Sequence, residues 1–122
     1  MSYEIPGLMI SLPASADLST KQFYCVVTSS GQLAVAGDGV TIVGILQDKP
    51  DAAGRPGAVM VSGVSKCSAG AAVTIDDIVA SDGNGQVVAA TTGEEGIGIA
   101  LEAASGADEI IAVLLKDLGD QP

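Results

Sequence analysis

Histidine and tryptophan are absent from the sequence, and aromatic residues make up only 2% of it. The three aromatic rings belong to Tyr3, Phe23 and Tyr24. Histidine is the commonest general base near neutral pH and the commonest metal ligand in proteins. Without it, neither a Ser-His-Asp triad nor a Cys-His pair can form within the chain. We therefore predict that the protein is not an enzyme and uses no metal ion or cofactor.

Basic residues are scarce as well, because 5 Lys and Arg stand against 15 Asp and Glu, which gives a formal net charge of −10. They are scattered singly along the chain, at Lys21, Lys49, Arg55, Lys66 and Lys116. Phosphate backbones require clustered Lys and Arg, and single-stranded nucleic acid requires aromatic platforms. The composition therefore excludes nucleic acid as a partner. The same charge argument disfavours a membrane surface, and no apolar run approaches the roughly 20 residues of a spanning helix.

Only two cysteines are present, Cys25 and Cys67, and their spacing fits neither a CxxC motif nor a zinc site. Each lies in a stretch of apolar or small residues. A free cysteine in such surroundings behaves as a small hydrophobic residue. We predict two buried, reduced thiols, with a disulfide between them as the alternative.

What the chain does contain is aliphatic residues and glycine: 48% of it is hydrophobic, and it has 16 Gly. The length of 122 residues fits one domain, and the composition is too apolar for intrinsic disorder. Short runs of strand-forming residues alternate with turn residues, which predicts an all-β fold, a small β-barrel or a β-sandwich. The predicted strands span residues 23–28, 32–36, 40–46, 58–61, 73–80, 86–89, 97–101 and 109–115.

The N-terminal segment, residues 1–21, differs from the rest because Pro6 and Pro13 forbid a regular helix. Two interpretations are open: an edge strand of the domain's own sheet, or an extended arm that adds to a neighbouring chain. We predict an N-terminal arm (1–21), a β domain (22–118) and a flexible C-terminal end (119–122). The candidate partner-binding residues of the arm are apolar: Ile5, Leu8, Met9, Ile10 and Leu12.

An internal repeat is the most specific feature of the sequence. A shift of 54 residues places Gly31-Gln32-Leu33 on Gly85-Gln86-Val87 and Gly44-Ile45 on Gly98-Ile99. Residues 23–61 and 77–115 are identical at nine of 39 positions, and residues 62–75 are expected to link the two copies. Glycine inside a strand weakens it unless it permits a bulge or a close backbone approach. Gly44 and Gly98 therefore predict two equivalent bent strands that cross near a pseudo-symmetry axis, as in a closed or nearly closed barrel.

Several local motifs have simpler explanations than a functional site. Asp82 followed by Gly83-Asn84-Gly85 predicts a tight hairpin, since a phosphate loop would need a Lys and a following helix. The pairs Asp76-Asp77 and Glu94-Glu95 lack the ligand spacing of an EF-hand and fit solvated turns. The A-G-x-x-V turn at residues 69–73, close to Lys66, is similar to turns of biotinyl and lipoyl carrier domains, but Lys66 lacks their flanking Met or acidic residues.

With these residues in view, the chain resembles the small capsid cement, or head decoration, proteins of tailed bacteriophages. The resemblance covers nearly the whole chain and begins with the N-terminal Pro-Gly segment. It is carried by V-V-T-S-S-G-Q-L-A-V-A (26–36), V-G-I-L-Q-D-K-P (43–50), V-M-V-S-G-V (59–64), A-G-A-A-V-T (69–74), I-G-I-A-L-E-A-A-S (97–105) and the final I-I-A-V-L-L (110–115).

This resemblance implies a structural protein without catalytic residues. Members of the family look like small β-barrels on the outer capsid surface of the virion, often as homotrimers, and are made in the host cytoplasm. They are expected to add after the shell expands and to hold neighbouring major capsid proteins together. The apolar arm residues would then add as a strand to an edge of the capsid protein. The alternatives are another virion module of tail or spike, a small acidic enzyme using Asp38 with Asp82, and a carrier domain.

Overall fold

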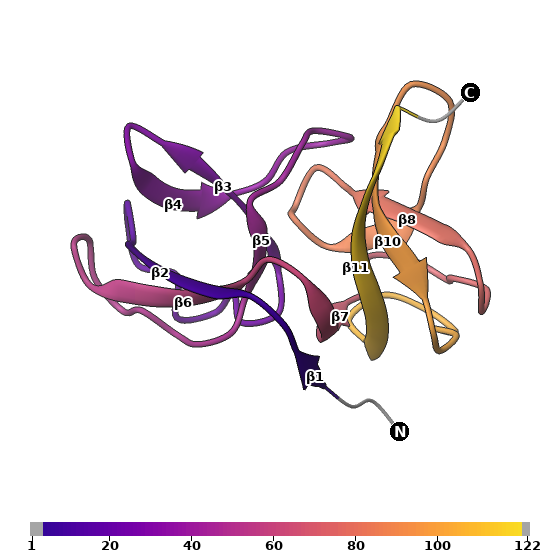
Figure 1. The fold of residues 1–122 in the computed structure, drawn as a ribbon, viewed down its shortest axis with the longest axis horizontal. Helices are drawn as coiled ribbons and strands as arrows, with labels where there is room; N and C mark the ends of the chain where they lie inside the picture. Colours follow the sequence, from indigo (N-terminus) through magenta and orange to yellow (C-terminus); the bar gives the residue numbers. More distant parts are fainter. Residues whose placement is uncertain (1–3, 121–122) are drawn as a thin grey trace.

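The computed structural model describes residues 4–120 of the chain. Over these residues the protein forms eleven strands and no helix, arranged in two antiparallel sheets (Figure 1). The all-β prediction is confirmed. In this part of the chain there is accordingly no helix long and apolar enough to cross a membrane. The strands are β1 (Ile5–Pro6), β2 (Met9–Pro13), β3 (Cys25–Ser29), β4 (Gln32–Val35), β5 (Gly44–Leu46), β6 (Pro56–Met60), β7 (Gly63–Ser68), β8 (Ile78–Ser81), β9 (Val87–Ala89), β10 (Glu95–Ala100) and β11 (Ile110–Asp120).

The two sheets have the same topology, as the sequence repeat predicts. The five-stranded sheet has the order β2-β6-β5-β3-β4, and the six-stranded sheet has the order β1-β7-β11-β10-β8-β9. Each strand of the first sheet thus has a counterpart at the same place in the second, and β1 is added at the edge. The first repeat forms the sheet of β2 to β6, and the second forms the sheet of β7 to β11 (Figure 1).

Each sheet is strongly curled but, over residues 4–120, does not close into a barrel. Single parallel bridges join Ala14, after β2, to Leu33 of β4, and Ala69, after β7, to Val87 of β9. The end of β2 thereby contacts the β3–β4 hairpin, and the end of β7 contacts the β8–β9 hairpin. Neither contact extends into a continuous ladder of paired strands. Of the two predicted architectures, the open two-sheet arrangement of a sandwich describes the molecule better than a closed barrel.

The strand pairing also refines the alignment of the repeats. Met9 pairs with Met60 as Val64 pairs with Leu114, and Cys25 pairs with Ile45 as Ile78 pairs with Ile99. The offsets are therefore 55 residues for β2 and 53 for β3, and the single shift of 54 holds only from β4 onward. The change from 55 to 53 falls before β3, because eleven residues separate Pro13 from Cys25 and nine separate Ser68 from Ile78. The change from 53 to 54 falls in the hairpin loop, which has two residues between Ser29 and Gln32 and three between Asp82 and Gln86.

The interior consists of two apolar clusters. The smaller lies inside the curl of the first repeat and contains Ala14, Leu18, Val26, Leu33, Leu46 and Val59. The equivalent residues of the second repeat belong to the larger cluster: Ala69, Val73, Val79, Val87, Ala100 and Val113. That larger cluster also contains Cys25, Ile45 and Met60 from the first sheet. Because neighbours along a strand point to opposite faces, β3, β5 and β6 are buried on both faces and bind the two repeats into one body.

Three sequence predictions are corrected by the strand assignments. The expected link 62–75 contains β7, an interior strand that pairs with β1 and β11. The strand expected at 40–46 is paired only over Gly44–Leu46. Gly119 and Asp120 are strand residues because they pair with Gly96 and Glu95, so the predicted flexible end is wrong for them, and residues 121–122 lie outside the described part.

Candidate functional site

The five apolar residues predicted to bind a partner lie in and between two edge strands. β1 pairs with β7, and β2 pairs with β6, so each forms an outer edge of its sheet. Ile5, Leu8 and Met9 are exposed, at 59%, 57% and 41% of their surface. Ile10 and Leu12 are half-buried and pack against the core of the first repeat. The structure therefore presents three of the five side chains to the surface and turns two inward, and a role of all five in binding stays a prediction.

The backbone holds this N-terminal segment along the junction of the two repeats. The Gly7 amide donates to the Ser62 carbonyl (3.1 Å), and the Leu8 amide donates to the Ser62 hydroxyl (3.0 Å). The Val61 amide donates in turn to the Leu8 carbonyl (2.8 Å). Gly7 is required here, because a Cβ would lie 2.8 Å from the Ser62 carbonyl oxygen. β1 and β2 thus form one outer edge that runs past both sheets.

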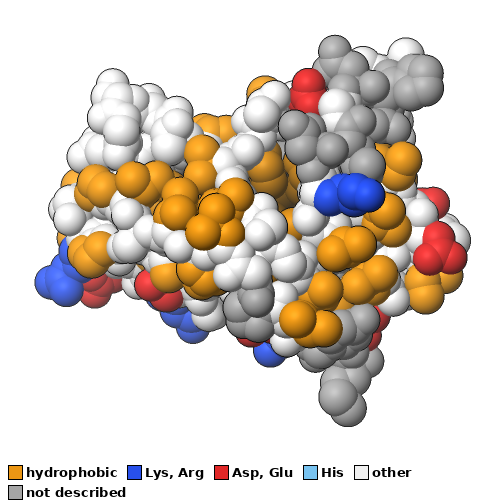
Figure 2. All heavy atoms as spheres, in the orientation of Figure 1, with side chains coloured by type: hydrophobic (Ala, Val, Ile, Leu, Met, Phe, Trp, Pro, Cys, Tyr) orange, Lys and Arg blue, Asp and Glu red, His pale blue; other side chains and the backbone are white. Residues whose placement is uncertain are grey.

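We name the outer rim of β1 and β2, with the exposed side chains of Ile5, Leu8 and Met9, the apolar edge. In the view of Figure 2, hydrophobic side chains gather in patches over both sheets, with few charged groups among them. Unpaired backbone groups on an edge strand offer hydrogen bonds to an added strand. The apolar edge therefore combines two features that a strand-adding partner needs, exposed backbone and exposed apolar side chains.

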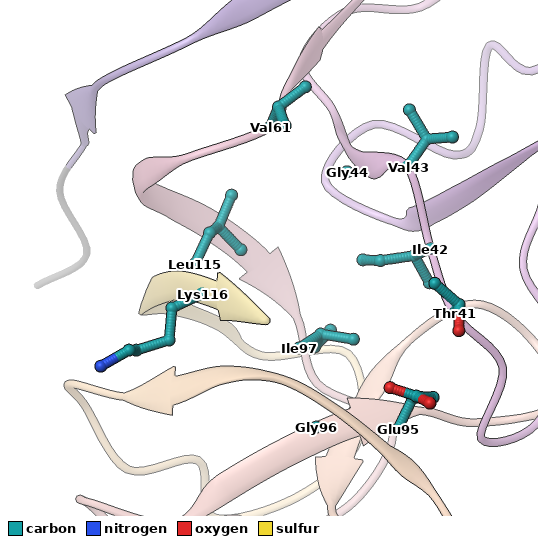
Figure 3. Close-up of a pocket in the computed structure, with 10 residues that line it drawn as sticks. All are labelled: Thr41, Ile42, Val43, Gly44, Val61, Glu95, Gly96, Ile97, Leu115 and Lys116. Carbon is teal, nitrogen blue, oxygen red and sulfur yellow. The ribbon is translucent and has the colours of Figure 1, made fainter. Parts of the chain in front are cut away.

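A small cavity lies between the repeats, and we name it the repeat cavity. It has a volume of about 150 Å³. Figure 3 shows that it is lined by residues 41–44 and Val61 of the first repeat and by residues 95–97, Leu115 and Lys116 of the second. Ligand pockets usually measure about 300–1,000 Å³. A volume of about 150 Å³ fits a single side chain better than a cofactor.

The lining residues of the repeat cavity are related by the repeat. Ile42 is equivalent to Gly96, Val43 to Ile97, and Val61 to Leu115. The cavity therefore lies on the pseudo-symmetry axis. Sequence reasoning predicted such an axis from the two G-I steps but not a cavity on it, because the shape depends on how the two sheets pack.

Gly44 and Gly98 each permit a close approach to the next strand of their own sheet, β6 and β11, while the predicted crossing of the two glycine strands stays a prediction. A Cβ on Gly44 would overlap the carbonyl oxygen of Met60 and lie 2.7 Å from Cγ1 of Val59. A Cβ on Gly98 would overlap the carbonyl oxygen of Leu114 and lie 2.8 Å from Cγ1 of Val113. Both glycines serve the same packing, one in each repeat.

The two cysteines are free and fully buried in the larger core cluster, as predicted. Burial raises the pKa of the Cys25 thiol to about 12. The pKa of Cys67 is also raised, first by burial and then by the neighbouring Cys25. Nucleophilic attack requires the thiolate, so these groups pack as small apolar side chains.

The carboxylates considered for catalysis have structural partners. One oxygen of Asp82 accepts hydrogen bonds from the amides of Asn84 (2.8 Å) and Gln86 (3.0 Å) and so holds the β8–β9 hairpin. Asp38 is exposed, and a hydrogen bond with Glu94, together with its charge, raises the pKa of Asp38. Among the described residues, no group of three or more His, Cys, Asp or Glu side chains is placed to hold a metal ion.

Lys66 does not occupy the position that a carrier domain requires. It lies inside β7, and its ammonium nitrogen is 5.8 Å from the centre of the Phe23 ring. A carrier lysine stands at the tip of a hairpin, so the similarity to biotinyl and lipoyl domains ends at the turn sequence.

Comparison with known proteins gives the class of the molecule. A family model described as phage cement protein matches residues 7–115. The chain belongs to the phage cement protein family, and it is a capsid-associated structural protein of a bacteriophage. The resemblance inferred from the sequence is thereby confirmed.

One solved structure extends the comparison to the fold. It is described as the crystal structure of the head fiber gp8.5 N base in bacteriophage phi29. This chain matches it with a TM-score of 0.75 at 13% identity, over 94% of this chain and 98% of that chain. At this identity the likeness shows a shared fold. A comparison with curated proteins found no match.

Proposed function

We propose that the protein is a capsid decoration protein that binds the outer surface of the expanded phage head. In this proposal it stabilises contacts between neighbouring major capsid proteins, acts as a homotrimer and is made in the host cytoplasm. Family membership supports the capsid as the partner. The apolar edge is the observation that carries the proposal, because it is exposed and runs past both repeats.

Binding would proceed by strand addition along the apolar edge. A strand of the capsid protein pairs with the free backbone of β1 and β2, and its side chains cover Ile5, Leu8 and Met9. Ile10 and Leu12 act from the other face by fixing β2 to the core. Many copies on a repeated shell multiply modest single interfaces, so each contact needs little affinity of its own.

Surface substitutions test this proposal better than truncation. Deleting residues 1–13 would remove β1 and β2 and expose the core beneath Ile10 and Leu12. The double variant Ile5→Asp/Leu8→Asp changes exposed positions and leaves these core contacts in place. A matched control is Ile75→Asp/Ile110→Asp, because both side chains are exposed apolar residues of the second repeat, at 53% and 40%.

The measurement is binding to expanded, undecorated heads of the phage that encodes the protein, followed by cryo-electron microscopy. We expect density on three-fold axes for the wild type and the control, and a loss of decoration for Ile5→Asp/Leu8→Asp. Equal decoration by all three proteins would disprove a role for the apolar edge. Binding to tails or spikes alone, with bare heads, would overturn the decoration function and favour the other virion module.

A further inference from the structure

One stretch of the first repeat lacks a strand partner that its counterpart has. In the second repeat, the first residues of β10 pair with the end of β11, Glu95 with Asp120 and Gly96 with Gly119. The equivalent stretch of the first repeat is residues 41–43, which precedes β5. Its Val43 amide donates to the Val26 carbonyl of β3 (2.9 Å), and its other side joins no ladder. Among the described residues, the amides of Thr41 and Ile42 take part in no backbone pairing.

The cause is the path of the chain after the fifth strand of each repeat, β6 or β11. β11 continues past Leu115 to Asp120 and so reaches the beginning of β10. β6 ends at Met60, and the chain then bends at Val61 and Ser62 and enters β7 in the other sheet. The segment after β6, which would otherwise pair with residues 41–43, therefore belongs to the other sheet. The first sheet keeps an open strand position where the second sheet is filled.

The repeat cavity lies beside this open position. Residues 41–44 line it on one side, and Leu115 and Lys116 line it on the other (Figure 3). Its apolar part includes Ile42, Val61 and Leu115. A cavity of about 150 Å³ with an aliphatic lining accepts a group the size of benzene, which is also the scale of a Leu, Met or Phe side chain.

We propose that the open strand position is a second docking site for the capsid protein, an inference that rests on the proposed function. An extended segment pairs antiparallel with residues 41–43, as the end of β11 pairs with β10, and inserts one apolar side chain into the repeat cavity. The end of β11 serves as the template for this occupant, since it covers the equivalent backbone in the second repeat.

The charge around the site indicates the composition of the segment. Glu95 is part of the cavity lining, its neighbour Glu94 interacts with Asp38, and Lys116 is the cationic residue of the lining. With a net charge of −10, the protein attracts a cationic partner. The segment is therefore expected to carry Lys or Arg next to its inserted apolar residue.

Two variants test the site by different means. Val61→Trp fills the cavity without adding charge, and Ile42→Pro removes the amide that the added strand would use, because its equivalent, Gly96, pairs with Gly119 of β11. Val40→Trp is the matched control, because Val40 is exposed at 39% and is not part of the cavity lining. Thermal unfolding of each free variant checks that the fold is retained.

The readout is the affinity of each variant for expanded heads, with hydrogen exchange of the wild type before and after binding. We expect at least a tenfold loss of affinity for Val61→Trp and Ile42→Pro, none for Val40→Trp, and slower exchange at Ile42 on the head. Unchanged affinity for the two site variants, or unchanged exchange at Ile42, would overturn the docking site and leave the decoration function standing. Wild-type protein that fails to bind heads would overturn both.

Discussion

Single glycine residues decide how closely the strands of each repeat approach. Gly44 and Gly98 are equivalent, and each faces the backbone carbonyl of a neighbouring strand. A side chain at Gly44 would push β5 and β6 apart, and a side chain at Gly98 would push β10 and β11 apart. This close packing explains why a V/I-G-I step occurs once in each copy of the repeat.

The variant Gly98→Ala tests this role. Its Cβ would overlap Leu114 and press on Val113, and overpacking of this kind lowers the free energy of unfolding by about 1–3 kcal/mol. Urea unfolding followed by circular dichroism measures the change. Gly37→Ala is the control, because a Cβ there meets nothing within 4 Å. A Gly98→Ala protein as stable as the control would show that the two strands separate without cost.

The two cysteines provide a second prediction at this scale. With the Cys25 pKa raised to about 12 and both side chains buried, native protein at pH 8 should not react with a disulfide reagent such as DTNB. Protein unfolded in urea should release two equivalents of the coloured thiol. Fast labelling of the native protein would mean that the larger core opens far more often than its packing suggests.

The same pKa predicts how stability changes in alkali. The folded state keeps the Cys25 proton up to about pH 12, whereas an unfolded thiol loses it near its ordinary value of 9.0. The free energy of unfolding should therefore fall as pH rises above about 9 and should continue to fall toward about 12. Comparing the alkaline unfolding of the wild type and Cys25→Ala isolates this contribution. An equally steep decline in Cys25→Ala would assign the loss to other groups.

At the scale of elements, β7 shows how polar residues can form an interior strand. Its Ser65 and Ser68 are buried, and their hydroxyls accept hydrogen bonds from the side-chain amides of Gln47 (2.8 Å) and Gln86 (2.9 Å). These partners are each 18 residues away along the chain. Locally the segment therefore has the composition of a loop, and only distant partners make it a strand.

Gln86 joins three elements and carries the prediction at this scale. Its side-chain amide, at the start of β9, donates to Ser68 of β7 and to Asp108 (2.7 Å), which precedes β11. Gln86→Leu leaves these groups without their donor, which should lower the free energy of unfolding by about 1–3 kcal/mol. Gln32→Leu, at the equivalent but half-buried place of the first repeat, should change it by less than about 0.5 kcal/mol. Urea unfolding measures the free energy of unfolding of both variants. Equal losses in the two would show that the hydrogen bonds of Gln86 add no stability beyond those at the equivalent position.

At the scale of the whole molecule, the two repeats share one core. Cys25, Ile45 and Met60 of the first sheet belong to the same cluster as Cys67 and Ile111 of the second. The path of β6 into β7 also carries the chain directly from one sheet to the other. The duplicated unit is therefore half of a domain and not a domain in itself.

Expression of the halves tests this conclusion. A fragment of residues 1–62 would expose Ile45 and Met60, and a fragment of residues 63–122 would lack β1 and the opposing sheet. We expect neither fragment to give the dispersed amide spectrum of a folded protein in two-dimensional NMR, whereas the full chain does. A dispersed spectrum from either half would show that the repeats fold independently.

The sequence could predict features that depend on local composition and on similarity between its own parts. The all-β class follows from strand formers between turns, the repeat from Gly44-Ile45 and Gly98-Ile99, and the buried thiols from their apolar surroundings. It could not predict β7 or the register changes between the repeats. Those depend on pairing between distant segments and on connections whose lengths differ, by two residues before β3 and β8 and by one residue in the hairpin loop.

The sequence by itself determined that this is an all-β, duplicated, strongly acidic protein of the phage cement family. The tertiary structure alone decided the surface it offers to a partner. Alternation along β2 turns Ile10 and Leu12 inward, while Ile5, Leu8 and Met9 stay exposed. The bend after β6 leaves residues 41–43 beside an apolar cavity. Composition and strand propensity are properties of neighbouring residues, whereas exposure and open strand positions arise only when distant strands pair.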